Sequence, residues 1–488
     1  MVMTCQNEVV LVKARALVLE DALNRRVDAL PNGEFIFQGD RILEVGTNLT
    51  RKVDRVLDWS DSLVSPGFID LNALGDIDHH LIYCEQDRPE KLNWSIDYLK
   101  EGPVEAMTAE EEAFKSLFAY TQLLRRGVTT IMPITCTYYK KAGETYEELV
   151  AAAKNAVTLG MRAYLGMGFI GKMHCWDTET QKRVTMPLES EGREGFENAK
   201  RFATEYDGYG HGLINTIMCP ERIELQTEDI LKETSAFAKE HGFLIRLHAA
   251  QGAFEYNLIQ KQFGMSSVKY LDSIGLLNDH FLISHALYTS GSTLVPEKGD
   301  SDLEILSQRG VSVIHCPLVY GRSGRGLQSF ARFRRFGIKL AMGSDTFPPD
   351  PFMNMRAGSM FAYAADPQAG HDNDFEAFWY AYTAGGADIL KRSDLGRIAQ
   401  GCKADFFRIP LNNVWLGTVE NPIRTLAMAA TGLDVSDVYV DGKPVVARHA
   451  VLNVSTEGMQ QKAEKYHQKL KESFRARSPL KNMDPFWQ

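Results

Sequence analysis

Short apolar runs rich in β-branched residues recur through the middle of the chain, and helical spacing of apolar positions fills most of the gaps between them. Each run has the length of a buried strand. Eight strands that alternate with helices are typical of an α/β fold of one kind, the (β/α)8 or TIM-like barrel. The expected strands are Val64–Ile69, Val128–Ile134, Arg162–Gly168, Leu213–Cys219, Phe243–Leu247, Phe281–Ser284, Val311–Ile314 and Ile338–Met342.

Two of the intervening helices carry clear start and stop signals. Thr108 and Glu111 have the spacing of a capping box, and the helix they open is expected to end at Gly127. A second helix is expected from Thr227 to Gly242. The first connection of the barrel, from Asp70 to Val128, is longer than the others and must hold an additional excursion.

Both ends of the chain consist mainly of short strands separated by turns. The expected strands are Val9–Val12, Ala16–Leu19, Glu34–Phe37 and Ile42–Val45 at one end, and Ala404–Ile409, Val438–Val440 and Pro444–Ala447 at the other. We therefore expect residues 1–65 and 400–455 to form one small β-sandwich domain, and residues 66–399 to form the barrel. The remainder, 456–488, holds an amphipathic helix over 456–475 that is expected to pack on the barrel exterior.

Composition narrows the function classes. The chain has 488 residues, 44% of them hydrophobic, which excludes collagen-like and disordered classes. Its net charge of −9 argues against nucleic-acid binding.

No apolar run reaches the ~18 residues of a membrane span, and the first residues lack a signal-peptide core, so we expect a cytoplasmic protein without a membrane partner. Seven cysteines, at 5, 84, 136, 175, 219, 316 and 402, are expected to be reduced thiols.

The chemistry-bearing residues gather where the expected strands end. His248 follows the fifth strand, His285 the sixth, His315-Cys316 the seventh, and Asp345 the eighth. Barrel enzymes build their active sites at these carboxyl ends. Three of only 12 histidines stand at successive strand ends, which predicts an active site made of His248, His285 and Asp345.

These residues also carry a family resemblance. The run Val64–Asp70 (VSPGFID), the two histidines and the final Gly-Ser-Asp are similar to the amidohydrolase superfamily, and most similar to its branch of cytosine and guanine deaminases and triazine hydrolases. The flanks agree, with Gly39–Ile42 resembling the turn of the family's β-domain and Leu395–Asp405 its return from the barrel. The resemblance implies a hydrolase of carbon–nitrogen bonds other than peptide bonds, acting on a small nitrogen-rich ring or amidine.

The resemblance also implies roles, and the chain departs from several of them. His248 matches a metal ligand, His285 a substrate-polarising histidine or second ligand, and Asp345 a ligand and general base. The family's two strand-one histidines are here Asn72 and Leu74, and its proton-shuttling glutamate is Gln251. We therefore expect a degenerate metal site and favour no cofactor, with one zinc or iron on His248 and Asp345 as the alternative. Substitute ligands are offered by Asp76, Asp78, His79 and His80, unless these form an ordinary polar loop.

Without a metal, Asp345 would take a proton from water or substrate, and a histidine would donate one to the leaving nitrogen. Gln251 and Asn72 are expected to bind a carbonyl or amidine edge. His315 and Arg322 are further substrate-binding candidates. The weaker candidates have competing structural interpretations, and they are Arg325, Arg332, Lys172, His174, Trp176, Tyr138, Tyr139 and Cys316, the last expected to be a buried structural thiol rather than a nucleophile.

Three functions remain open at this stage. The first is the carbon–nitrogen hydrolase, and the second is a metal-free ring-opening or ring-closing enzyme, a lyase or an isomerase, on the same fold. The third is a non-catalytic binding homologue, which a retained charged Asp345 disfavours. The expected partner is a small-molecule substrate, and a homodimer is the expected assembly if the chain pairs at all.

Overall fold

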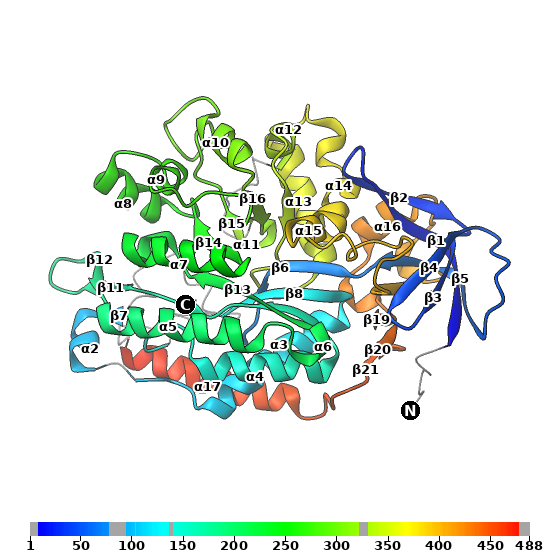
Figure 1. The fold of residues 1–488 in the computed structure, drawn as a ribbon, viewed down its shortest axis with the longest axis horizontal. Helices are drawn as coiled ribbons and strands as arrows, with labels where there is room; N and C mark the ends of the chain where they lie inside the picture. Colours follow the sequence, from blue (N-terminus) through cyan, green and yellow to red (C-terminus); the bar gives the residue numbers. More distant parts are fainter. Residues whose placement is uncertain (1–7, 78–93, 103, 136–139, 322–329, 478–488) are drawn as a thin grey trace.

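The middle of the chain forms a parallel barrel, as predicted (Figure 1). The structure is a computed structural model that describes residues 8–77, 94–102, 104–135, 140–321 and 330–477. In spatial order the barrel strands are β6 (Phe68–Leu74), β8 (Val128–Ile134), β9 (Arg162–Leu165), β13 (Ile214–Pro220), β14 (Leu244–Ala249), β15 (Phe281–His285), β16 (Ser312–His315) and β17 (Leu340–Met342). The α/β barrel prediction is confirmed.

The first predicted strand, however, had the wrong bounds. Residues 64–66 end β5 (Arg55–Pro66), a strand of the other sheet, and β6 begins only at Phe68. Gly67 makes the transition between them. A Cβ at Gly67 would lie 2.1 Å from Thr129 Oγ1, so only glycine lets the chain pass this close to β8.

Helices cover the outside of the barrel, and the predicted caps are present. α3 (Ala109–Arg125) opens with the Thr108–Glu111 capping box, and α7 (Glu228–His241) ends at Gly242 in the left-handed conformation. The other helices on the barrel include α4 (Tyr146–Leu159), α5 (Glu189–Tyr206), α8 (Ala253–Phe263), α10 (Ser301–Arg309), α12 (Phe330–Arg335), α13 (Pro351–Ala365) and α14 (Phe375–Tyr382).

The long first connection holds the expected excursion. It contains β7 (Trp94–Ser95), α2 (Ile96–Glu101) and α3, and β7 pairs with β11 (Lys172–Asp177), which in turn pairs with β12 (Lys182–Pro187). This three-stranded sheet thus joins the loop after β6 to the segment after β9.

Strands from both ends of the chain lie together in a second, nine-stranded sheet (Figure 1). Hydrogen bonds link all nine strands into one sheet. The predicted runs Val9–Val12 and Ala16–Leu19 are parts of a single long strand, β1. The strands are β1 (Val9–Asp21), β2 (Arg26–Pro31), β3 (Glu34–Gln38), β4 (Arg41–Gly46) and β5, with β18 (Phe406–Pro410), β19 (Asp437–Val440), β20 (Lys443–Ala447) and β21 (Ala450–Val451).

The last described helix, α17 (Met459–Arg477), packs on α3 along the predicted stripe. Its Ala463, Tyr466 and Leu470 are buried beside Phe114, and Phe474 lies outside the side chains that the structure describes. Among the described residues, no helix has the length and apolar character needed to cross a membrane.

Candidate active site

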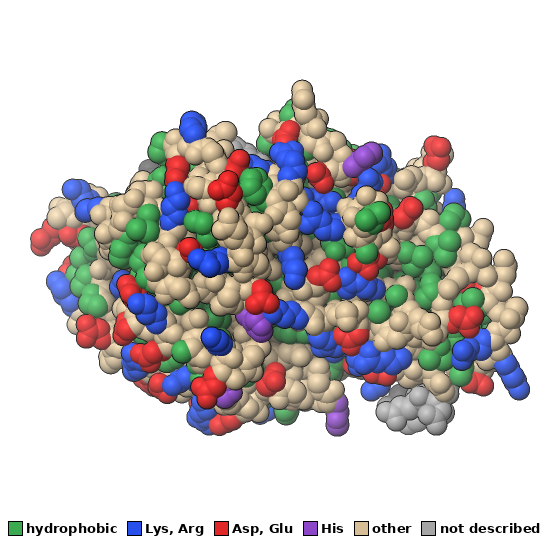
Figure 2. Space-filling view, turned by 45° about the horizontal axis from the view of Figure 1, so that its top comes forward, with side chains coloured by type: hydrophobic (Ala, Val, Ile, Leu, Met, Phe, Trp, Pro, Cys, Tyr) green, Lys and Arg blue, Asp and Glu red, His purple; other side chains and the backbone are tan. Residues whose placement is uncertain are grey.

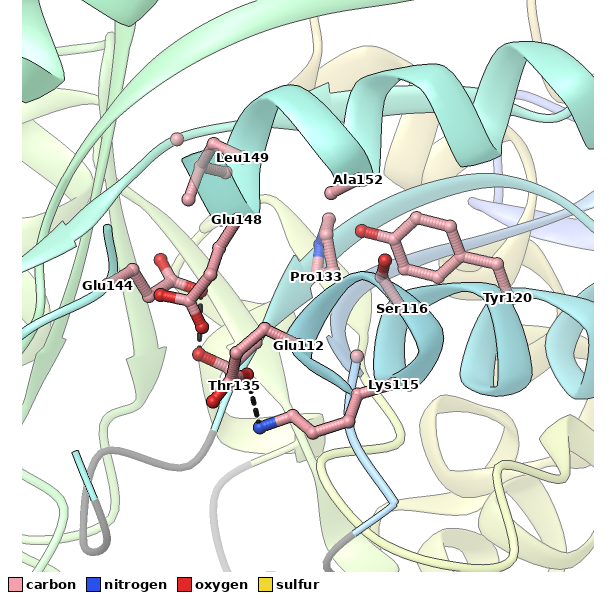
Figure 3. A pocket seen from close by; sticks show the side chains of 12 residues that line it. Glu112, Lys115, Ser116, Tyr120, Pro133, Thr135, Glu144, Glu148, Leu149 and Ala152 are labelled. Atoms are coloured by element: carbon pink, nitrogen blue, oxygen red, sulfur yellow. Dashed lines mark hydrogen bonds and ion pairs between the residues drawn. The ribbon is translucent and has the colours of Figure 1, made fainter. Parts of the chain in front are cut away.

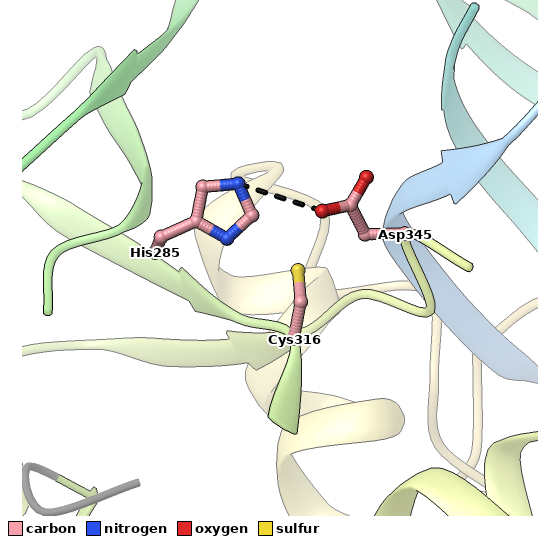
Figure 4. Close-up of side chains that lie close together, drawn as sticks. All are labelled: His285, Cys316 and Asp345. Carbon is pink, nitrogen blue, oxygen red and sulfur yellow. Dashed lines mark ion pairs between the residues drawn. The ribbon is translucent and has the colours of Figure 1, made fainter. Parts of the chain in front are cut away.

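Three donor side chains meet at the carboxyl ends of β15, β16 and β17 (Figure 4). His285, Cys316 and Asp345 each present a ligand atom, and these atoms lie within 4.8 Å of one another. His285 Nε2 is 3.6 Å from Asp345 Oδ2. The His285 side chain is fully buried and that of Asp345 is 13% exposed. The structure therefore brings together two of the three predicted catalytic residues, with an added thiol.

The backbone at this cluster is held in an uncommon conformation. His285 has φ of 81° and Asp345 has φ of 47°, both in the left-handed region. Non-glycine residues there cost free energy that the surrounding fold must offset, and such residues gather at functional sites. The strand ends are therefore shaped to aim these two side chains at each other.

His248, the third predicted catalytic residue, lies beside this cluster. Its ring centroid is 5.3 Å from that of His285. Its Nδ1 lies 2.6 Å from the carbonyl oxygen of Glu221, which can only accept a hydrogen bond, so Nδ1 carries the hydrogen. Burial, with the charges of Arg222 and Arg246, holds the pKa of His248 well below its ordinary value. His248 is therefore neutral, and the lone pair of its Nε2 is available for a ligand.

Asn72 lies at the floor of the site rather than at its mouth. Its side chain is fully buried, its Oδ1 accepts from Ser284 Oγ at 3.2 Å, and its Nδ2 lies 3.6 Å from Cys316 Sγ. Below it, Asp70 accepts hydrogen bonds from the amides of Ser344 and Asn72. Burial raises the pKa of Asp70 to about 6.

The other predicted substrate-binding residues do not meet at this point. Gln251 is half-buried, and its Oε1 accepts from Arg222 Nη1 at 2.6 Å. His315 is fully buried against α12, with its ring centroid 5.8 Å from that of Phe330 and 5.5 Å from that of Phe333. Burial lowers the pKa of His315 to about 3. This histidine thus lies apart from the cluster and contributes to packing.

Several candidates fall outside the described residues, and they are Asp78, His79, His80, Tyr138, Tyr139, Arg322 and Arg325. Of the others, Arg332 is tied to Asp300 and to the carbonyl of Ser290. Asp76, a candidate substitute ligand, instead forms a buried ion pair with Lys115. His174 lies 3.5 Å from Glu224, beside the barrel mouth.

Sequence reasoning missed a second group of polar residues beside His248. One pocket is lined by His248 together with Thr135, Glu144, Glu221 and Arg246. Arg246 donates to the carbonyls of Met132 and Pro133, both at 2.9 Å. Burial raises the pKa of Glu221, whose Oε2 is buried without a hydrogen-bond partner among the described residues. Glu221 follows β13, so extending the strand-end argument to the fourth strand would have found it.

A buried network of charges was also missed, of which Figure 3 draws Glu112, Lys115 and Glu148. Lys115 Nζ lies 3.1 Å from Asp76 and 2.7 Å from Glu112, and Lys140 pairs with Glu112 at 3.3 Å and with Glu148. All of these side chains are at most 10% exposed. The network connects the segment after β6 to α3 and α4, next to the barrel end that bears the site. On the face of the molecule drawn in Figure 2, by contrast, acidic and basic side chains are interspersed.

Comparisons with known proteins agree with this architecture. A model of the "Amidohydrolase family" matches residues 63–445. A 5-methylthioadenosine/S-adenosylhomocysteine deaminase of Pyrococcus abyssi is 26% identical over 435 residues, 88% of this chain and 92% of that protein. The fold matches an adenosine deaminase from Xanthomonas campestris with bound zinc (TM-score 0.75, 19% identity, 95% and 98% coverage). It also matches a triazine hydrolase from Arthrobacter aurescens (TM-score 0.75, 18% identity, 94% and 99% coverage).

Proposed function

Since this chain belongs to the amidohydrolase family, as its sequence indicated, and is thus a hydrolase of carbon–nitrogen bonds other than peptide bonds, we propose that it deaminates a small nitrogen-rich ring. The observation that carries the proposal is the contact of His285 with Asp345 at the barrel's carboxyl end. The relatives named above act on adenosine-type compounds and triazines, so an amino-substituted purine is the substrate class we favour.

Asp345 is the general base in this proposal. Its carboxylate takes one proton from water, the water oxygen bonds to the ring carbon, and the carbon–nitrogen bond breaks. The amino group leaves as ammonia after receiving that proton, and the oxygen stays on the ring. His285, whose Nε2 lies 3.6 Å from Asp345 Oδ2, holds the carboxylate in position beside the attacking water.

Neutral His248 and the nearby carboxyl of Glu221 complete the proton-handling groups. Gln251 stands where the family resemblance expects a glutamate and cannot exchange protons. Glu221 can, because it is a carboxyl whose pKa is raised by burial, and it lines the same pocket as His248. We therefore assign the acid role expected of position 251 to Glu221.

The donor set also fits a divalent metal. His285 and Asp345 offer nitrogen and oxygen atoms of the kind that zinc prefers, and the neutral His248 ring lies beside them, 5.3 Å from that of His285. When bound there, such a metal would supply Lewis-acid polarisation of the water or the substrate. Against this fit, Asn72 has its amide engaged by Ser284 and Cys316, and Leu74 has no donor atom.

A second candidate function is a metal-free ring opening or closing, or an isomerisation. The observation that favours it is the neutral amide of Gln251 and its hydrogen bond from Arg222, in place of an acidic group. This alternative predicts a product with no loss of nitrogen.

The test is a screen of the purified chain against adenosine, 5-methylthioadenosine, S-adenosylhomocysteine, guanine and an amino-triazine. Ammonia release in step with product supports deamination, and a product that retains all nitrogen atoms supports the second function. If compounds of the set bind and none of them is turned over, both proposed activities are overturned, and the chain is a non-catalytic binding homologue. Asp345→Asn is the matched inactive control.

A further inference from the structure

We propose that Cys316 is a metal ligand, and that with His285 and Asp345 it forms a thiolate-containing site for zinc or a similar divalent metal. The inference goes beyond the proposed function, because it concerns what the barrel binds and not which bond it breaks. Positions 72 and 74 are Asn and Leu, where the family resemblance implies histidine ligands, and in this proposal the thiol on the seventh strand takes the place of one of them.

The distances suit such a site. Ligand atoms around a tetrahedral zinc, bound at about 2.0–2.3 Å, are separated from one another by roughly 3.3–3.8 Å. Here the three donor atoms lie within 4.8 Å of one another, and His285 Nε2 and Asp345 Oδ2 are already 3.6 Å apart (Figure 4). Each atom therefore needs to move by about 1 Å or less to share one ion.

The residue chemistry is also that of a zinc site. A thiolate, an imidazole and a carboxylate are the three ligand types that bind zinc in proteins. Thiolate favours zinc over magnesium or calcium, which prefer oxygen ligands alone. His248 stands beside the three donors with its Nε2 lone pair available, so it or water can complete the coordination.

Asn72 supplies the supporting contact that a thiolate ligand needs. Its Oδ1 is engaged by Ser284 Oγ, and this directs its Nδ2 toward Cys316 Sγ at 3.6 Å. A hydrogen bond donated to a metal-bound thiolate fixes its direction and tunes its charge. Asn72 would therefore not bind the metal itself but would position the sulfur that binds it.

Gly343 provides the room for this arrangement. A Cβ on Gly343 would lie 2.5 Å from Asn72 Cβ and 3.0 Å from Cys316 Sγ. Any larger residue would push the amide or the sulfur out of place. The absence of a side chain at Gly343 therefore leaves the space that the Asn72 amide and the Cys316 thiol occupy.

Cobalt spectroscopy of the full chain tests the proposal without a substrate. The protein is stripped with a chelator and titrated with Co²⁺, and in parallel with Zn²⁺. We expect about one ion per chain, and a thiolate-to-cobalt charge-transfer absorption in the near ultraviolet. Cys316→Ser should abolish that absorption. It should also weaken zinc binding by at least ~10–100-fold, which is the usual loss when a residue that only hydrogen-bonds to a metal ligand is removed.

Two further variants keep the result interpretable. Cys402→Ser is the matched control, because Cys402 is another buried thiol whose Sγ donates to the Ser393 carbonyl, a bond that a hydroxyl can also make. It should leave absorption and affinity unchanged. Asp345→Asn should weaken binding but retain the charge-transfer band at saturating cobalt, because the sulfur is still present.

Three results would overturn the proposal: no metal uptake by the unmodified chain, uptake without the charge-transfer band, or full affinity in Cys316→Ser. None of these readouts depends on ammonia release, so failure of the metal site is distinguished from failure of the proposed deamination.

Discussion

The backbone amide of Asp345 donates a hydrogen bond to the carbonyl oxygen of Asn72, with 2.8 Å between the two atoms. This contact joins the segment after β17 to β6, and so helps to close the barrel between its eighth and first strands. It also means that the first strand, although it carries Asn72 where the family resemblance implies a histidine, helps to determine where Asp345 stands.

Replacing Asp345 by Asn should lower turnover by about 10²–10⁴-fold, because the amide cannot accept the proton from water. Folding should be preserved, since asparagine tolerates the left-handed conformation that Asp345 adopts at φ of 47°. Ammonia release and the thermal unfolding midpoint are the measurements. Asp345→Ala should in addition lower the midpoint, because alanine is strained at this φ. Full activity in Asp345→Asn would show that the base lies elsewhere.

Glu221→Gln should lower kcat by about 10²-fold and remove one limb of the pH–rate profile, because it deletes a titrating carboxyl beside His248. The measurement is kcat/KM as a function of pH, over about four pH units centred on neutrality. The control is Glu224→Gln, a nearby buried carboxyl that contacts His174 instead. If Glu221→Gln leaves both limbs of the pH–rate profile unchanged, the general acid is a group other than Glu221.

Asp70 should make the protein less stable as pH rises from about 4 to 6. Burial raises its folded pKa to about 6, above its ordinary 3.8. Its contribution to stability is complete below the unfolded pKa and is lost as pH rises through the folded pKa, because the unfolded chain releases the proton first. At ~1.4 kcal/mol per unit of pKa, the loss is of order 3 kcal/mol.

Urea unfolding at a series of pH values checks this, and Asp70→Asn should flatten the slope between pH 4 and 6. Asp177→Asn is a control of opposite sign. The Thr180 hydroxyl lowers the pKa of Asp177, so this residue adds stability above its unfolded pKa and loses it as pH falls. A slope that survives Asp70→Asn would assign the effect to another buried carboxyl, such as Glu255 with its pKa of about 7.

Lys140→Met should destabilise the protein by about 3–5 kcal/mol, because Glu112 and Glu148 would be left buried without their shared cation. The free energy of unfolding in urea is the measurement. Lys232→Met is the matched control, since Lys232 pairs with Glu228 on the surface, where the two side chains are 52% and 46% exposed. It should cost about 0.5 kcal/mol or less. Equal costs would mean that Lys140 is not needed to neutralise the network.

The sequence predicted the barrel, and the gathering of polar side chains at its carboxyl end, because both follow from a simple repeat. Strands that alternate with helices bring all carboxyl ends to one face, so His248, His285 and Asp345 could be placed together without knowing any contact. Between two neighbours, that reasoning favoured His315 as a substrate-binding residue and Cys316 as a buried structural thiol. His315 and Cys316 are consecutive, and consecutive strand residues point to opposite sides.

The structure resolves that choice in favour of the cysteine. Ile314 and Cys316 pack inside the barrel, while Val313 packs in the outer core and His315 against α12. Applying the two-residue period to this strand would have predicted the outcome. The charge network could not be predicted in the same way, because Asp76, Lys115 and Lys140 become partners only through the packing of separate elements.

The sheet shared by the two ends of the chain bears on how the protein is made. Strand β5 pairs with β18, and Arg408 hydrogen-bonds Ser62 across 346 residues of sequence. A ribosome that adds about 5–20 residues per second needs on the order of 20–70 s to cover that distance. Throughout this interval the edge of β5 is without the strand that will cover it. This composite sheet can therefore close only after β18 has been synthesised, although every strand of the barrel precedes β18 in the chain.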